Sequence, residues 1–362
     1  MSRTSKTSYI MMSLIVAITS ALIGCSAQTN QAATSSQQSA AEQQQPAATA
    51  QATSTQEVKK REHLTIQAPV GISLSSPIYK MIEDKSLSPF AENVEYKPWK
   101  TPDELRARIS SGQAEVSAVP TYVGANLYNR GMDVKLINTL IWGILYMIGP
   151  DGESVSWDSL RGQTVHVPFK GDMPDLVFRY LLKKNNLDPT KDVKIEYVSA
   201  PQELVGLLVA GKAKYAILPE HMATMSVMQG NKAGKKLGKV MSLQAEWAKA
   251  TGKSPRIPQA GILVSGELIA KHPELVAELQ KQFEQSVQFL NEQPKDAAAM
   301  IAKYQDGLTP PIIESVIPSL NLQFVSAKDA KEELEFFFTE LSTLSPEIIG
   351  GKLPDAGFYY AP

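Results

Sequence analysis

The chain has 362 residues and a formal net charge of -1, and it is 43% hydrophobic and 20% charged, which is ordinary for a globular protein long enough to form two packed lobes. This charge balance, without a Lys/Arg cluster interleaved with aromatic residues, argues against nucleic acid as a partner. A single cysteine excludes an intrachain disulfide and cysteine-based zinc or iron–sulfur sites, and the four histidines form no His-x-x-x-His pair, so no metal or other cofactor is predicted.

Residues 1–25 have the organisation of an export signal. Arg3 and Lys6 give it a positive start, and residues 9–23 form an apolar run too short to remain as a membrane-spanning helix. The run ends in the letters LIGC, which resemble a bacterial lipobox, so we predict cleavage before Cys25 and acylation of that residue. The alternative is an ordinary signal peptide that contains a cysteine by chance.

Residues 26–58 are rich in Gln, Ala, Ser and Thr and show no apolar periodicity. Such a segment cannot bury enough apolar surface to offset the entropy lost on ordering, so we predict a disordered linker. Behind an acylated Cys25, this linker would tether the folded part of the chain to a bacterial membrane.

The folded part is predicted to begin with a strand at 64–68, a loop at 69–75 and a helix at 76–84. A loop between the carboxyl end of a strand and a helix presents backbone N–H groups to a ligand. Ser73 and Ser75 in this loop are therefore candidate ligand-binding residues. The alternative is a plain turn, in which both serines serve only the local backbone.

Further strands are predicted at 93–99 and 115–119, with a helix between them. Tyr122 is predicted to lie in the loop after the second of these strands, ahead of a helix at 123–130, and is a candidate to stack on a ligand. The order helix, glycine, strand and loop returns at 202–219. Strands that alternate with helices form parallel sheets, so we predict two similar βαβ lobes.

Residues 134–149 are apolar and strand-like. We interpret them as the last strand of one lobe, a crossover and the first strand of the other. Trp142 falls near the crossover, where it could stack on a planar ligand. The alternative is a tryptophan that only packs the hinge, since aromatic side chains bury well in either role.

Residues 159–221 are predicted to form most of the second lobe. The predicted strands are 164–167, 193–198 and 215–218, and the predicted helices are 175–184 and 202–210. Ligands of parallel sheets bind at the carboxyl ends of the strands, which here precede residues 169–173 and 219–221. Asp172, Met173 and Glu220 are therefore candidate ligand-binding residues.

A helix at 222–229 and a strand at 240–243 are predicted to complete this lobe. The strand at 258–265 is predicted to return to the first lobe as the second crossover, with Gln259 at the edge of the cleft. Four later helices are predicted to pack on the first lobe: 272–291, 295–304, 310–317 and 327–341.

One run of residues carries a family resemblance. It consists of Leu160, Gly162, Thr164, Val167, Leu187, Pro189, Asp192, Val193, Leu207, Leu208, Gly211, Lys212 and Glu220. The run resembles the second lobe of ABC-transporter substrate-binding proteins of the nitrate/sulfonate/taurine and thiamine-precursor group. Lys214 stands where that group usually has aspartate, and His221 stands where it usually has proline.

The resemblance extends over residues 60–362 and implies a fold. That fold is the α/β, type II periplasmic-binding-protein fold, in which two βαβ lobes are joined by two crossover strands. Residues 59–144 and 262–362 would form the first lobe, and residues 145–261 the second.

The resemblance also implies a function, that of a lipid-anchored, monomeric solute-binding protein of an ABC importer. Such a protein works with a permease and an ATPase in the cell envelope, facing the periplasm or the exterior, and closes on a small solute by hinge motion. In this scheme Tyr122 and Trp142 stack on the solute. Ser73, Ser75, Gln259, Asp172 and Glu220 bond to its polar groups.

The charge of the solute follows in part from the cleft loops. They offer Lys170 but no arginine, and they carry Asp172 and Glu220, which favours a neutral or cationic heteroaromatic such as a vitamin precursor. A sulfonate or nitrate anion is the runner-up.

Two other function classes compete with solute binding. Eukaryotic relatives in the thiamine-precursor group are enzymes of pyrimidine synthesis, with several cysteines and an active-site histidine. Here Cys25 lies outside the folded part and His221 has no evident Ser or Cys partner in the sequence, so we predict no enzyme. A surface adhesion lipoprotein that reuses the fold is a third class.

Overall fold

The computed structural model describes residues 60–305 and 307–362. The export signal, the linker and the acylated Cys25 predicted from the sequence lie outside these residues. Within the described residues, no helix combines the length and the apolar character needed to cross a bilayer.

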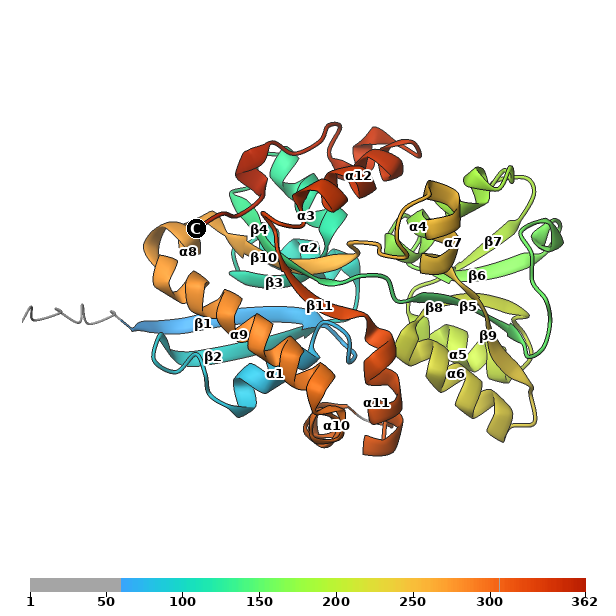
Figure 1. Cartoon of the computed structure of the whole chain (residues 1–362), viewed down its shortest axis with the longest axis horizontal. Helices are drawn as coiled ribbons and strands as arrows, with labels where there is room; N and C mark the ends of the chain where they lie inside the picture. Colours follow the sequence, from blue (N-terminus) through green and yellow to red (C-terminus); the bar gives the residue numbers. More distant parts are fainter. Residues whose placement is uncertain (1–59, 306) are drawn as a thin grey trace, which may run out of the picture. The chain divides into compact units, whose positions relative to one another are not determined.

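The first of two mixed sheets has six strands in the order β11-β4-β10-β3-β1-β2 (Figure 1). Its strands are β1 (Arg61–Pro69), β2 (Ala91–Trp99), β3 (Val116–Pro120), β4 (Val134–Ile141), β10 (Ala260–Ser265) and β11 (Leu322–Ser326). β1 pairs in parallel with β2 and β3, whereas β10 runs antiparallel to β3 and β4. We call this sheet with its helices lobe 1.

The second sheet has five strands in the order β7-β6-β8-β5-β9. Its strands are β5 (Leu145–Pro150), β6 (Thr164–Pro168), β7 (Lys194–Val198), β8 (Tyr215–Pro219) and β9 (Leu237–Ser242). β6 pairs in parallel with β7 and β8, whereas β5 runs antiparallel to β8 and β9. We call this sheet with its helices lobe 2.

The chain passes between the lobes twice, after β4 and before β10, which confirms the predicted α/β fold with two crossovers. Both sheets are mixed rather than parallel, because each crossing chain enters its new sheet at the carboxyl edge. Leu145 at the start of β5 pairs with Pro219 at the end of β8, and Ala260 at the start of β10 pairs with Pro120 at the end of β3. The predicted lobe boundary after residue 261 falls inside β10, so we place it before Ala260.

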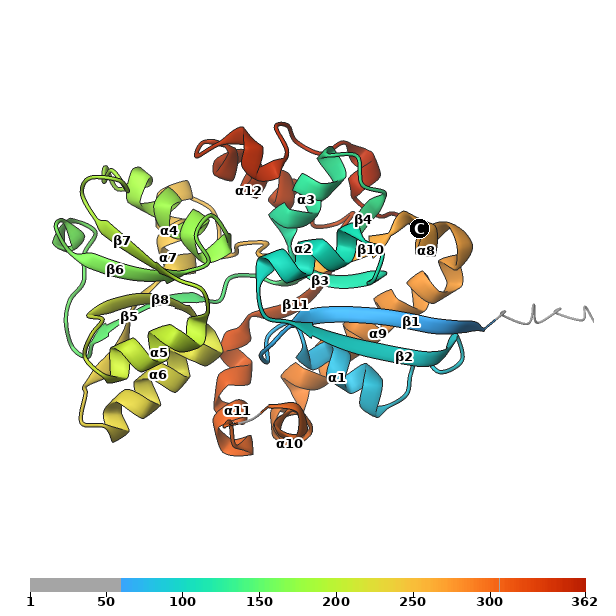
Figure 2. The ribbon, with the colours of Figure 1, turned by 180° about the vertical axis from the view of Figure 1, so that it is seen from behind.

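Helices cover both faces of the lobe 1 sheet. α1 (Ser76–Glu83) and α9 (Pro273–Glu292) lie on one face (Figure 1), and α2 (Pro102–Ser110) and α3 (Thr121–Asn129) lie on the other (Figure 2). α9 buries Leu275, Leu279, Phe283 and Val287, spaced at four residues along a single helical face, so this face packs on the sheet. α8 (Gly266–Lys271), α10 (Pro294–Ile301) and α11 (Pro310–Val316) complete the lobe.

Helices also cover both faces of the lobe 2 sheet. α4 (Met173–Lys184) and α7 (Leu243–Thr251) pack on one face, and α5 (Pro201–Val209) and α6 (Glu220–Lys232) on the other. The buried side chains of the two helix pairs belong to separate hydrophobic clusters. The cluster beneath α4 and α7 continues into lobe 1.

That continuation runs through α12 (Lys331–Ser342), which was predicted to pack on the first lobe. Its Glu340 accepts a hydrogen bond of 2.6 Å from the Tyr180 hydroxyl on α4. The ring of Phe337 lies 5.6 Å from that of Trp247 on α7, centroid to centroid. The prediction was therefore incomplete, because apolar periodicity marks a buried face without naming the partner that covers it.

Two local predictions also differ from the structure. β11 was not predicted, because it is only five residues long and its pairing partner β4 is remote in sequence. Tyr122 was predicted in a loop, whereas α3 begins at Thr121 and carries Tyr122 in its first turn. On α3 the Tyr122 hydroxyl reaches Asp172 of lobe 2.

Candidate ligand-binding site

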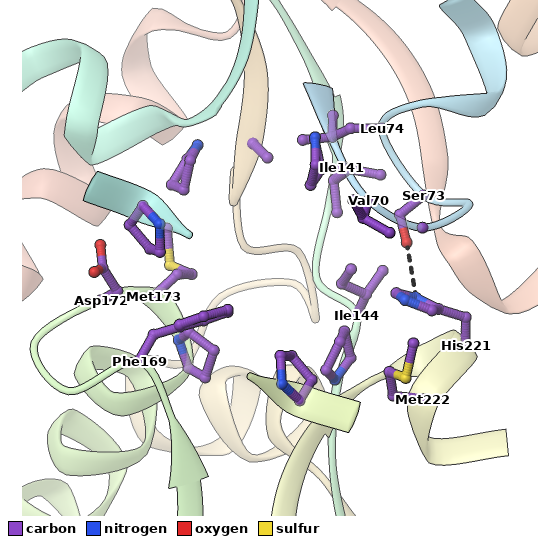
Figure 3. Close-up of a pocket in the computed structure, with 18 of the residues that line it drawn as sticks. Val70, Ser73, Leu74, Ile141, Ile144, Phe169, Asp172, Met173, His221 and Met222 are labelled. Carbon is purple, nitrogen blue, oxygen red and sulfur yellow. Dashed lines mark hydrogen bonds between the residues drawn. The ribbon is translucent and has the colours of Figure 1, made fainter. Parts of the chain in front are cut away.

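A cavity of about 380 Å³ lies where the carboxyl ends of strands from both lobes meet (Figure 3). Its walls are mainly apolar. They include Val70, Leu74, Trp99, Ile141, Ile144, Phe169, Met173 and Met222. A concave, mostly apolar cavity with a few polar groups is the usual form of a small-molecule site, and this volume falls within the usual range.

Proline is unusually frequent in this lining, and its position has a reason. β1, β3 and β8 end in Pro69, Pro120 and Pro219, because proline lacks the N–H that would continue the ladder. α2 and α5 begin with Pro102 and Pro201, where a missing N–H costs nothing. Strand ends and helix starts meet at the cavity, so proline rings form part of its wall.

Phe169 reaches the cavity through a strained backbone. Its φ is +59°, a left-handed conformation that non-glycine residues rarely adopt and that costs on the order of 1 kcal/mol. The following Gly171 and Asp172 close the turn into α4, and the Phe169 ring faces the cavity (Figure 3). Strained residues cluster at ligand sites, so Phe169 is a further candidate for ligand contact.

His221 and Ser73 form a polar pair across the lobes. His221 Nδ1 lies 3.5 Å from Ser73 Oγ, and both residues line the cavity. The imidazole also lies beside Gly71, where a Cβ would come within 2.9 Å of Nε2 and where the φ of +133° disfavours a side chain. Burial lowers the pKa of His221 to about 4, so the ring is neutral near pH 7.

Asp172 connects the two lobes on the other side of the cavity. Its Oδ1 accepts a hydrogen bond of 2.6 Å from Arg106 Nη2 on α2 and a second one from the Tyr122 hydroxyl on α3. Burial and the neighbouring carboxylate raise the pKa of Tyr122 well above its usual value, so its hydroxyl keeps its proton. Asp172 and Ser73 lie on opposite sides of the cavity in Figure 3.

Gln259 lies in the second crossover and contacts the first. Its Oε1 accepts a hydrogen bond of 3.3 Å from the backbone N–H of Ile144. Among the hydrogen bonds of the described residues, none uses its amide nitrogen, which remains free to donate to a ligand.

Known proteins resemble this chain in sequence and in structure. A family model described as menaquinone biosynthesis matches residues 179–343, less than half of the chain. YtlA of Bacillus subtilis (strain 168), which carries the name of a binding protein, is 22% identical over 232 residues, or 63% of this chain. The match spans 66% of YtlA, just under two thirds of its length.

Solved structures match more of the chain. An ABC transporter structure from Parabacteroides distasonis has a TM-score of 0.65 and 22% identity, and the match covers 82% of this chain and 98% of that one. The periplasmic aliphatic sulphonate binding protein SsuA from Escherichia coli has a TM-score of 0.66 and 13% identity, with 84% and 93% covered. The chain has the periplasmic binding protein fold. The resemblance to ABC-transporter substrate-binding proteins is thus confirmed at the level of the fold.

Within this binding-protein fold, half of the predicted site residues line the cavity. They are Ser73, Asp172, Met173 and Gln259. The others, Ser75, Tyr122, Trp142 and Glu220, are buried beside it and are absent from its lining. Contact of the first four with a solute remains a prediction.

Trp142 and Ser75 have structural partners instead. Trp142 donates from Nε1 to the Gln323 backbone oxygen at 2.9 Å, and the Arg256 guanidinium covers its ring at 3.8 Å. Trp142 therefore packs the hinge, the alternative that the sequence left open. Ser75 Oγ donates to the Pro69 backbone oxygen at 2.5 Å, so it holds the local turn.

Of the two predicted carboxylate ligands, Glu220 is more buried than Asp172, with 1% of its surface exposed. Its Oε1 accepts hydrogen bonds from Thr224 and from Lys239 on β9. The Lys239 side chain is partly exposed. In the structure Glu220 therefore forms an ion pair within lobe 2.

The two partners of this ion pair should differ in their effect on stability. Lys239→Ala is expected to lower the free energy of unfolding by about 2 kcal/mol, because it leaves a buried carboxylate without a counterion. Glu220→Gln should cost only about 1 kcal/mol, because the lysine can turn to water. Urea unfolding of both variants checks this. A larger loss for Glu220→Gln than for Lys239→Ala would contradict the described geometry.

Several lining residues escaped sequence reasoning, among them Val70, Leu74, Ile144 and Phe169. All lie within segments that the sequence marked as cleft loops or crossovers, but polar residues were favoured there. The arginine that approaches the cleft was missed because Arg106 lies on a helix, 66 residues from Asp172. The Ser partner of His221 was missed for the same reason, since Ser73 is 148 residues away.

Proposed function

We propose that this chain is the solute-binding protein of an ABC importer and that it binds a small heteroaromatic solute, of the vitamin-precursor kind, in the cavity between its lobes. The observation that carries this proposal is the cavity, with its apolar walls and the polar groups of Ser73, His221 and Gln259. The likeness to an ABC transporter structure and to a sulphonate binding protein supports the importer role.

A planar ring suits the cavity better than a small, strongly hydrated anion does. Phe169 and Trp99 provide aromatic surface in the lining, so they replace Tyr122 and Trp142 as the residues that would stack on the solute. Ser73, neutral His221 and the Gln259 amide would bond to its polar edges. A sulfonate remains the second candidate, because a structural relative is named for that ligand and Lys100 lies in the lining.

Catalysis is a weaker candidate on chemical grounds. The Ser73–His221 pair and the match to a menaquinone-biosynthesis family model are the observations in its favour. A serine nucleophile needs a base that is itself oriented, usually by a carboxylate. In residues 60–305 and 307–362, no carboxylate is hydrogen-bonded to His221, and the 3.5 Å between Ser73 Oγ and His221 Nδ1 is longer than an ordinary hydrogen bond.

The remaining parts of the proposal concern the cell envelope. Acylation at Cys25 would anchor a monomeric protein on the outer face of a bacterial membrane, where the linker at 26–58 lets it reach a permease and its ATPase. Cys25→Ser should move the protein from the membrane fraction to the soluble fraction. Retention in the membrane fraction would remove the lipid anchor from the proposal.

A thermal-shift screen tests the proposed solute binding. Vitamin precursors, other heteroaromatics, alkanesulfonates and nitrate are added to the mature protein one at a time. A solute at 100 times its Kd stabilises the native state by about 2.7 kcal/mol, which raises Tm by about 5 °C in a protein of this size. We expect such a rise from a heteroaromatic. A rise from sulfonates alone would favour the second candidate, and a flat response to the whole panel would contradict both.

A further inference from the structure

We propose that the cavity selects an uncharged solute. This inference rests on the proposed solute binding and names the ligand class more narrowly than the sequence, which left neutral and cationic compounds open. The physical basis is that the carboxylates around the cavity are paired with cationic side chains, His221 is neutral, and Lys100 is exposed to water.

The first charge to consider is that of Asp172, the acidic residue in the lining. Aspartate is a preferred N-cap, and Asp172 occupies the N-cap position of α4, yet its side chain makes no capping hydrogen bond. Its carboxylate instead meets Arg106 and Tyr122 from lobe 1. The negative charge is therefore matched by a guanidinium, and the three side chains form a clasp that ties the lobes together beside the cavity.

The negative charge of Glu220 is also paired, and the His221 imidazole is uncharged. Glu220, next to the lining, is paired with Lys239 inside lobe 2. His221 is buried, and its Nδ1 faces the uncharged hydroxyl of Ser73. The remaining charged side chain of the lining, Lys100, is exposed, so water screens its charge.

Four helix N-termini at the cavity, those of α2, α4, α5 and α6, offer little to an anion, whereas α1 and α3 have no carboxylate in their first turns. An anion binds there to free backbone N–H groups and to the positive end of the helix dipole. α2, α4 and α5 carry Pro102, Pro174 and Pro201 within their first two positions, and Pro219 precedes α6, so each of these ends lacks one donor. Each also has a carboxylate in its first turn: Asp103 and Glu104, Asp175, Glu203, and Glu220. These carboxylates already complement the dipoles and would repel an anion.

Changing one member of the clasp should therefore change the preferred charge of the ligand. Asp172→Asn leaves Arg106 with only the exposed Asp103 carboxylate, 3.5 Å from Nη1, as a counterion, which favours an anion at the edge of the cavity. Arg106→Gln leaves the Asp172 carboxylate with the Tyr122 hydroxyl but without a cation, which favours a cationic ligand. The double variant restores neutrality. This pattern is specific to a compensated pair, because a residue with a purely structural role would not exchange one ligand charge for another.

The experiment uses three probes on one ring system, 2-naphthol, 2-naphthalenesulfonate and 2-naphthylmethylammonium, with the mature protein at pH 7. Isothermal titration at millimolar probe is expected to detect binding of 2-naphthol alone by the native sequence. Asp172→Asn should bind the sulfonate at least about tenfold more tightly than the native sequence does, and Arg106→Gln should do the same for the ammonium. The double variant should return to the native preference.

A matched control is Asp192→Asn, which removes the charge of an ion pair contained within lobe 2, between Arg161 Nη1 and Asp192 Oδ1 at 3.0 Å. It should leave the probe preference unchanged. Tight binding of either charged probe by the native sequence overturns the inference and leaves solute binding intact. Absence of binding by all three probes overturns the inference too, and a failed solute screen would then mark the failure of the proposed function itself. The inference is also overturned if Asp172→Asn and Arg106→Gln keep the ligand-charge preference of the native sequence.

Discussion

Lowering the pH from 7 to 4 is expected to reduce the free energy of unfolding by about 3 kcal/mol through His221 alone. Burial lowers the pKa of His221 to about 4 in the folded protein, whereas the pKa of a free histidine side chain is 6.5. The unfolded chain therefore binds the proton first. The stability that neutral His221 contributes is fully present above pH 6.5 and is lost as the pH falls toward 4. Chemical denaturation at several pH values measures this slope.

The variant His221→Gln separates this residue from the other titrating groups. Glutamine keeps a polar side chain beside Ser73 but cannot titrate, so the variant should lose about 3 kcal/mol less than the native sequence between pH 6.5 and 4. The two curves should run parallel above pH 6.5. Parallel curves over the whole range would show that His221 does not become charged on unfolding, and would contradict its burial in a neutral form.

Trp247→Ala is expected to cost about 4 kcal/mol of stability, within the range for removing a buried tryptophan. Trp247 is fully buried and packs with Tyr180 on α4 and with Phe337 on α12. Because α12 belongs to lobe 1 and the other two residues to lobe 2, this aromatic cluster joins the lobes beyond the two crossovers. Urea unfolding of the native sequence should therefore show one transition.

The neighbouring phenylalanines of α12 supply the control for the aromatic cluster. Phe337 is fully buried, whereas Phe336 is only half-buried and contacts Trp247 from the edge. Phe337→Ala should cost about 3 kcal/mol, and Phe336→Ala about half as much. Equal losses, or a Trp247→Ala variant as stable as the native sequence, would mean that the lobes are not packed together through α12.

The elements of the fold followed well from the sequence where local signals were strong. Glycine and proline punctuate the chain, and β1, β3, β6 and β8 all end in proline, so strand ends were visible. What local signals could not supply was pairing over long distances. β11 joins β4 across some 180 residues, and nothing in its own five residues specifies that partner.

The site shows the same limit more sharply. The loops that line the cavity were identified because ligands bind at the carboxyl ends of parallel strands. The roles within them were assigned by residue type, and type alone does not tell a ligand contact from a buried pair. Trp142 looked like a stacking surface, yet Arg256, 114 residues later, covers its ring. Asp172 was predicted as a ligand group, and its Oδ1 also accepts from Arg106 and Tyr122.

The most direct test of solute binding in the cavity is titration of a cavity-blocking variant. Ala200 lines the cavity at the start of α5, is half-buried and has an extended backbone that accepts a large residue, whereas Ala210 at the other end of α5 is exposed and away from the cavity. With the solute found by thermal shift, Ala200→Trp should bind about 100-fold more weakly than the native sequence, and Ala210→Trp should bind as the native sequence does. Equal affinity of the two tryptophan variants would place the solute elsewhere and contradict the account.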